Sequence, residues 1–210
     1  MTLAHAGVVY TNGLPDGAGG VEMTRYMQAE DINPLSDVTF NVLRFWTREP
    51  TGGGAYNGFI DWVINLNSVS NFPLPDRVTA TNGGAIRTFS QVLTGSYDEY
   101  QIDLSLVTPI TLTAGTTYWF SLHNGGHTTE TADEDFMWGT TATPVGFSSY
   151  HFDMQATPAP GPWVTNGGTE LAYQLLLDES LLTPEPGTWT MMAGAVAGLA
   201  ALRQRRQVAK

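Results

Sequence analysis

Two short segments of the chain carry side chains that could bind a metal ion. His123 and His127 are four residues apart, a spacing that would place both rings on one face of a helix. Asn124-Gly125-Gly126 lies between them and predicts a loop, because Asn and Gly accept the positive φ of tight turns. We therefore expect a solvated loop tip here, and no metal site on these histidines.

The acidic run that follows offers oxygen ligands. Asp133, Glu134 and Asp135 are consecutive, and carboxylate oxygens suit Ca²⁺. Asp16 or Asp153 would supply further oxygens. The alternative is a solvated acidic loop without an ion. The sequence thus assigns no metal site; Asp133 and Asp135 are calcium candidates, and structural calcium is the one cofactor left open.

Tryptophan side chains are the candidates for contact with sugars, because sugar rings pack against exposed indoles. Trp138 flanks the acidic run and Trp163 lies in a Pro- and Gly-rich segment, so we expect both to be exposed. Trp46, Trp62 and Trp119 lie in apolar strand-like runs and are predicted to be core residues. Trp138 and Trp163 are therefore the candidate glycan contacts, with packing under loops as the alternative.

Motifs of the common enzyme classes are absent from the sequence. It contains no GxSxG, P-loop, Rossmann glycine pattern or HExxH. Without cysteine it has no disulfide, thiolate nucleophile or cysteine-ligated zinc. A glycosidase needs two carboxylates across a cleft, but an acid-rich sequence alone singles out no pair. We assign no catalytic residue and expect a protein that is not an enzyme.

The charge of the chain is unevenly distributed. Before Pro184 there are 19 acidic residues and five arginines, a net charge of −14; residues 184–210 carry four basic residues and one acidic residue, a net charge of +3. The sum is the −11 of the whole chain. A phosphate backbone would repel so acidic a domain, so we expect no nucleic-acid partner.

The C-terminal segment has three parts in a fixed order. Pro184, Glu185 and Pro186 form a triplet that resists helix formation. The uncharged, mostly apolar stretch 187–202 follows, and then the basic residues Arg203, Arg205 and Arg206. A membrane span needs about 17–25 residues, so this stretch predicts a short one. The arginines indicate a cytoplasmic stop, which leaves the rest of the chain outside.

This order resembles the PEP-CTERM sorting signal of exported proteins in Gram-negative bacteria. Pro184, Glu185 and Pro186 match its triplet, whereas Thr183 stands where Val is frequent. The resemblance implies that the partner is exosortase, a membrane-embedded transpeptidase. It also implies a transient anchor in the inner membrane, removal of the tail, and attachment to the cell surface or extracellular matrix. The alternative is a plain membrane anchor.

The N-terminus also reads as a targeting segment. Ala4 and Ala6 flank His5 in the small-x-small pattern of a signal-peptidase site. We expect residues 1–6 to be the remnant of a signal peptide whose start lies upstream, and the mature chain to begin at Gly7. The alternative is an ordinary alanine-rich N-terminus.

Between these ends, apolar and polar residues alternate with a period of two, as in Tyr100–Leu106. Asn-Gly pairs at 12–13, 57–58, 82–83, 124–125 and 166–167 indicate tight turns. We predict an all-β domain at 7–179 (the β domain), an antiparallel, jelly-roll-like β-sandwich of about eight to ten strands. A linker at 180–188 with the PEP motif, a single hydrophobic transmembrane sorting helix at 189–202 and a basic cytoplasmic tail at 203–210 follow.

The segment 111–122 is similar to the LxAGTxYWxS strand pair of secreted bacterial β-sandwich modules. This resemblance supports the fold more than a function. Together, these features predict an exported, non-enzymatic envelope or matrix protein linked to exopolysaccharide and biofilm. The alternatives are a carbohydrate-binding module and, further removed, a glycoside hydrolase.

Overall fold

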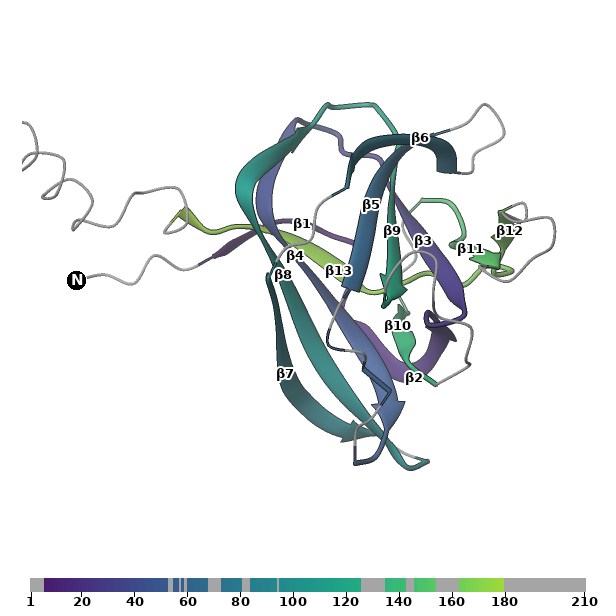
Figure 1. Ribbon diagram of the computed structural model, residues 1–210. Helices are drawn as coiled ribbons and strands as arrows, with labels where there is room; N and C mark the ends of the chain where they lie inside the picture. The colour runs from purple at the N-terminus through teal and green to yellow at the C-terminus, as the bar shows by residue number, and fades with distance from the viewer. Residues whose placement is uncertain are drawn as a thin grey trace, which may run out of the picture. The chain divides into compact units, whose positions relative to one another are not determined.

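The computed structural model describes residues 6–52, 55–56, 58, 60–67, 73–80, 84–93, 95–125, 135–142, 146–153 and 163–179. Gly7–Leu177 form one compact unit. Its described residues form two antiparallel sheets and contain no α-helix, so the predicted all-β fold is confirmed (Figure 1).

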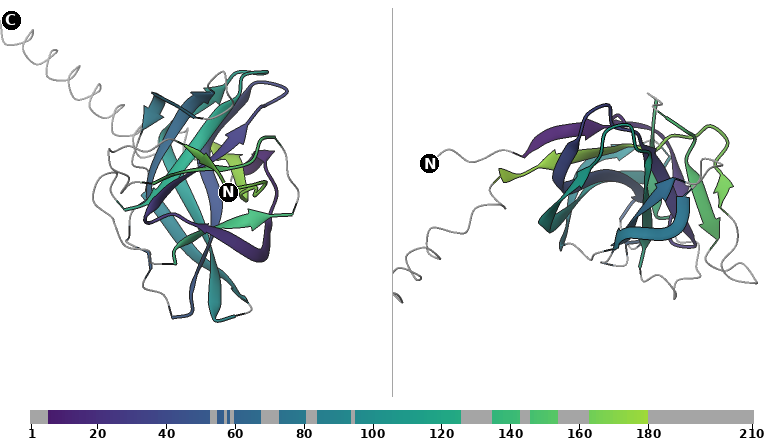
Figure 2. Two further views of the ribbon diagram at one scale, coloured as in Figure 1. Left: turned by 90° about the vertical axis from the view of Figure 1, so that its right-hand side faces the viewer. Right: turned by 90° about the horizontal axis from the view of Figure 1, so that it is seen from above.

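The larger sheet is built around one long strand, β4 (Val38–Pro50). One edge of β4 pairs along its whole length with β8, and the other edge is shared by β13 and β10. β4 and β8 lie side by side in every view (Figures 1 and 2). The other strands of this seven-stranded sheet are β1 (Gly7–Thr11), β2 (Pro15–Glu22), β7 (Gly84–Leu93), β8 (Tyr97–Leu112), β10 (Met137–Thr141) and β13 (Tyr173–Leu177).

The second sheet has six strands in the order β12-β11-β3-β9-β5-β6, and all of its neighbours are antiparallel. Its bounds are β12 (Val164–Thr165), β11 (Tyr150–Asp153), β3 (Tyr26–Ile32), β9 (Tyr118–Asn124), β5 (Ile60–Asn67) and β6 (Pro73–Ala80). The two sheets, with seven and six strands, together contain more strands than the eight to ten expected. The reason is that a strand as short as β12 has too few residues to show in a hydrophobic pattern.

The hydrophobic core lies between the two sheets. Phe40 on β4 meets Phe120 on β9 edge to face, with ring centroids 5.9 Å apart. Phe120 also meets Tyr173 on β13 at 5.5 Å. All three side chains are fully buried, so residues of both sheets fill one interior, which is consistent with a β-sandwich.

The alternation predicted from the sequence is observed in β8. Ile102, Leu104 and Leu106 are buried, whereas Asp103 and Ser105 between them are half-buried. β9 differs, because all seven of its residues are buried. Both faces of the second sheet are therefore covered at β9, which a one-sided alternation does not reveal.

The turn at Ala114 and Gly115 is confirmed, with Gly115 at φ +70° and β9 beginning at Tyr118. The two strands that it joins do not form a pair, however. β8 belongs to the seven-stranded sheet and β9 to the six-stranded one, so this connection crosses between the sheets. Asn12-Gly13 likewise turns the chain without forming a hairpin, since β1 and β2 pair with different strands.

The described residues include no helix long and apolar enough to cross a membrane. The predicted sorting motif, sorting helix and arginine cluster lie outside the described residues, as does Ala4. The divisions predicted at both ends of the chain stay predictions.

Candidate functional site

Three carboxylates from distant parts of the sequence meet inside the β domain. Glu30 and Asp31 lie on β3, and Glu170 lies just before β13. One oxygen of each lies within 4.8 Å of those of the other two, and we call these three residues the acidic cluster. Glu30 and Asp31 are 0% exposed and Glu170 is 6% exposed, so the protein encloses the cluster and Glu170 lies nearest to the surface.

The open edge of β3 explains how two consecutive residues can share one site. Neighbouring residues of a strand point to opposite faces of the sheet. β11 pairs with β3 only from Tyr26 to Ala29, and among the described residues no strand pairs with that edge further on. We infer that the side chains of Glu30 and Asp31 reach this edge from the two faces and meet there.

Backbone and amide groups hold one oxygen of each carboxylate. The Leu171 N–H donates to Glu30 Oε2 at 2.7 Å, and the Phe147 N–H donates to Asp31 Oδ1 at 2.9 Å. Asn12 follows β1; its amide hydrogen-bonds the Glu170 carboxylate, and its Nδ2 donates to Leu171 O at 3.0 Å. The cluster is thus positioned by segments from both sheets.

The remaining oxygens of the site have no N–H or hydroxyl donor. Glu30 Oε1, Asp31 Oδ2, Glu170 Oε2 and Asn12 Oδ1 are all buried in this way, and a proton shared between Glu30 and Glu170 would join two of the carboxyl groups. Each buried polar atom left in this way costs about 1–3 kcal/mol. Four such acceptors at one place need either protons or a cation.

Burial raises the pKa of all three carboxyl groups. It raises the pKa of Glu30 well above its usual value, and the neighbouring Glu170 raises it further. The pKa of Asp31 rises to about 7, chiefly by burial, with the Phe147 N–H opposing and Glu170 adding to the shift. Burial also raises the pKa of Glu170, against hydrogen bonds from Glu30 and Asn12. Without a cation, the cluster therefore retains protons near neutral pH.

Gly146 is required where the chain passes the acidic cluster. Its φ is +109°, and a Cβ built on it would lie 2.5 Å from Asp31 Oδ2. No other residue fits this close approach of backbone to carboxylate.

Two tyrosines line the site beside the carboxylates. The Tyr173 hydroxyl donates to the backbone oxygen of Asp31 at 2.8 Å. The Tyr10 ring stacks on that of Tyr173, with centroids 6.0 Å apart. Burial raises the pKa of both phenols, so they remain neutral donors next to the acidic cluster.

The histidine prediction is wrong for His123, which is not in a solvated loop. It lies on β9 and is 0% exposed. Its Nε2 is 2.6 Å from Thr24 O and its Nδ1 is 3.2 Å from Gly125 O, so each ring nitrogen lies beside a backbone carbonyl. The strand continues through His123 to Asn124, into the Asn-Gly-Gly signal that predicted a loop. His127 lies outside the described residues.

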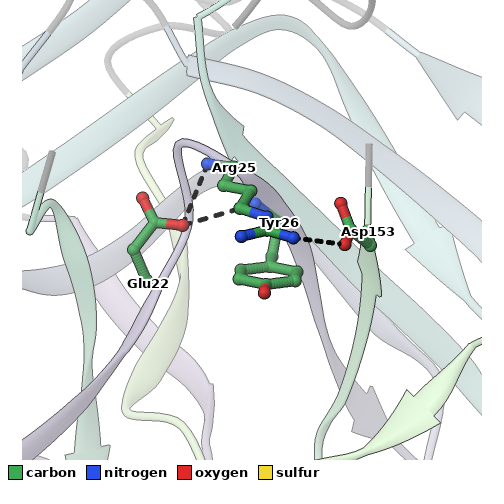
Figure 3. A network of polar contacts seen from close by, with 4 residues as sticks. All are labelled: Glu22, Arg25, Tyr26 and Asp153. Atoms are coloured by element: carbon green, nitrogen blue, oxygen red, sulfur yellow. Dashed lines mark hydrogen bonds and ion pairs between the residues drawn. The ribbon is translucent and has the colours of Figure 1, made fainter. Parts of the chain in front are cut away.

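The further calcium candidates have partners of other kinds. Asp16 Oδ1 accepts from the Ala18 N–H and from Thr140 Oγ1, both at 2.8 Å. Asp153 forms an ion pair with Arg25 at 2.9 Å (Figure 3). In the same view Glu22 accepts from the backbone N–H groups of Arg25 and Tyr26, which fixes the turn before β3.

Asp135 is exposed and belongs to no set of three possible ligands among the described residues, while Asp133 lies outside them. The pair Asp133 and Asp135 therefore stays a prediction, whereas the described part of the chain offers oxygen ligands at the acidic cluster.

The exposure predicted for Trp138 is wrong. Trp138 is 0% exposed, donates from Nε1 to Ala172 O at 2.9 Å, and packs against Phe45 with ring centroids 5.8 Å apart. Trp138 lies on the buried face of β10. The acidic run that precedes it in the sequence suggests an exposed position instead. Trp163 is half-buried, with its ring 5.3 Å from that of Phe152. The core positions predicted for Trp46, Trp62 and Trp119 are confirmed.

Sequence reasoning missed the acidic cluster because Glu170 lies far along the chain from Glu30 and Asp31. One signal was available: Glu30 and Asp31 are adjacent acids inside a strand, between Ala29 and Ile32. Acidic residues are almost never fully buried without a partner, so such a pair in a buried strand marks a site. Nothing in the sequence indicated that Asn12 and Glu170 join it.

Comparison of the chain with protein-family models, with curated proteins and with solved structures found no match in any of the three.

Proposed function

We propose that this protein is an exported, non-enzymatic component of the cell envelope or extracellular matrix, sorted by its C-terminal segment. The observation that carries the proposal is the order of the Pro184–Pro186 triplet, apolar stretch and arginines. Exosortase is the proposed processing partner, the inner membrane the transient anchor, and exopolysaccharide the proposed final association.

The organisation of the β domain supports this division. The compact unit ends at Leu177, ahead of the triplet in the sequence, which is the order that the proposed division requires. We further propose that the two sheets form a jelly-roll-like sandwich and that the apolar stretch forms the sorting helix. An acid-rich, cysteine-free domain is compatible with either redox compartment.

The proposal is tested by mass spectrometry of the chain, produced with a complete signal peptide ahead of Gly7, in an exosortase-containing Gram-negative host. We expect an extracellular form that begins at Gly7 and ends near the triplet. Replacement of Pro184, Glu185 and Pro186 by alanine should leave the tail intact and the protein in the membrane, whereas Thr183→Ala should be processed normally. An extracellular wild-type chain that retains Lys210, or accumulation in the cytosol, would contradict the proposal.

A carbohydrate-binding module is the alternative, favoured by the half-buried Trp163 beside Phe152. A glycan array distinguishes the two, because binding that Trp163→Ala abolishes would support the module. A glycoside hydrolase has less support. The acidic cluster is enclosed and its carboxylates lie within 4.8 Å of one another, so it does not form the pair across a cleft that such an enzyme needs.

A further inference from the structure

We propose that the acidic cluster and Asn12 bind one Ca²⁺ ion, which ties the two sheets together. This inference goes beyond the proposed function and depends on neither sorting nor export.

The first argument is the lack of compensation for buried negative charge. Glu30 and Asp31 are fully buried, and four acceptor oxygens of the site have no N–H or hydroxyl donor. Neither the ion pair of Arg25 with Asp153 nor that of Arg44 with Asp103 involves the acidic cluster. Buried carboxylates are normally paired or coordinate a metal, so a cation would complete this site.

The second argument is an unpartnered amide oxygen on a buried residue that contacts the cluster. Asn12 is 0% exposed, and its Nδ2 is occupied by Leu171 O while the amide contacts Glu170. Its Oδ1 has no partner. An amide oxygen carries no proton of its own, so it needs either a donor or a cation. A cation would satisfy it.

Chemistry and size favour calcium. The available ligands are all oxygens, which excludes the nitrogen- and sulfur-rich sets that zinc prefers. Ligands on opposite sides of Ca²⁺ are roughly 4.6–5.2 Å apart, twice its usual bond length, against about 4 Å for Mg²⁺. The carboxylate oxygens lie within 4.8 Å of one another, which a Ca²⁺ shell accommodates, and its flexible set of six to eight oxygen ligands could include backbone oxygens or water near Glu170.

The location defines what the ion would do. Asn12 follows β1 and Glu170 precedes β13, both in the seven-stranded sheet, whereas Glu30 and Asp31 lie on β3 of the other sheet. One ion would link segments near the two ends of the β domain. In a chain without cysteine, such a link would take the place of a disulfide between the sheets.

Thermal unfolding of the full chain in mild detergent tests the proposal, in EDTA and then with CaCl₂ or MgCl₂. At about 100 times its Kd, Ca²⁺ should raise the Tm by about 5–10 °C, and Mg²⁺ by much less. Glu170→Gln should weaken Ca²⁺ binding at least tenfold. Asp135→Asn, which removes one exposed carboxylate, should respond as the wild type does.

A second measurement uses the wild-type protein and therefore still tests the proposal if Glu170→Gln fails to fold. Tb³⁺ substitutes for Ca²⁺, and Tyr173 beside Asp31 should sensitise its emission in the wild-type protein until Ca²⁺ displaces it. A folded wild type that shows neither a Ca²⁺-dependent Tm nor displaceable Tb³⁺ emission would overturn the proposal. So would a Ca²⁺ response that Asp135→Asn abolishes and Glu170→Gln preserves, or a response to Mg²⁺ alone.

Discussion

Replacement of Asp31 by asparagine should stabilise the metal-free protein at high pH. Burial raises the pKa of Asp31 from 3.8 to about 7, so between these values the folded chain holds a proton that the unfolded chain releases. The stability contributed by this proton is complete below about pH 4 and is lost as the pH rises through about 7. The full loss is on the order of 4 kcal/mol, at about 1.36 kcal/mol for each pKa unit.

The side chain introduced by Asp31→Asn would carry no charge to bury, yet its amide oxygen could still accept from the Phe147 N–H. That bond would be weaker than a bond to a carboxylate, by about 1 kcal/mol. At pH 8 in EDTA, Asp31→Asn should therefore raise the free energy of unfolding by about 2–3 kcal/mol. At pH 4 the variant should be no more stable than the wild type, because Glu30, Asp31 and Glu170 are then all protonated.

Urea unfolding followed by circular dichroism at pH 4, 6 and 8 measures this difference, with Asp135→Asn as the control for removal of one exposed carboxylate. Saturating Ca²⁺ at pH 8 should make the wild type more stable than the variant, since the wild type binds the ion and the variant does not. The reasoning is refuted if Asp31→Asn lowers stability in EDTA by the same amount at pH 4 and pH 8.

Two further substitutions test the surroundings of the site. Gly146→Ala should lower the free energy of unfolding by about 3 kcal/mol, because its Cβ would meet Asp31 Oδ2, whereas Gly115→Ala, at φ +70° in open space, should cost only about 1 kcal/mol. Trp138→Phe should cost about 2–3 kcal/mol, because it leaves a carbonyl unpaired and a gap in the core, and Trp163→Phe less than about 1 kcal/mol. Urea unfolding measures both pairs; equal effects within either pair would contradict the assignment.

The β fold was predictable because its signal is local. The alternation in β8 by itself predicts that Ile102 and Leu104 share the apolar face of a strand. Gly115 by itself permits the positive φ of the turn before β9. The pairing of strands was not predictable in this way. That β8 and β9 belong to different sheets depends on β4 and β3, which lie far away in the sequence.

The site was less predictable than the fold, for the same reason. A run of adjacent acids such as Asp133–Asp135 attracts attention in a sequence, yet adjacent acids in a sequence need not share an ion. The acidic cluster instead depends on the open edge of β3 and on two residues, Asn12 and Glu170, that tertiary packing brings to it. Burial, which the sequence shows only indirectly, turns these four residues into a candidate ligand set.

The calcium site is tested most directly by a crystal structure of the full chain grown in CaCl₂, with anomalous data. An anomalous peak is expected between the carboxylates of Glu30, Asp31 and Glu170 and the Asn12 amide oxygen, with metal–oxygen distances of about 2.3–2.6 Å. A cluster without a peak and with its carboxyl oxygens in direct contact at neutral pH would contradict the site. Ordered calcium at Asp133 and Asp135 with an empty cluster would contradict it as well.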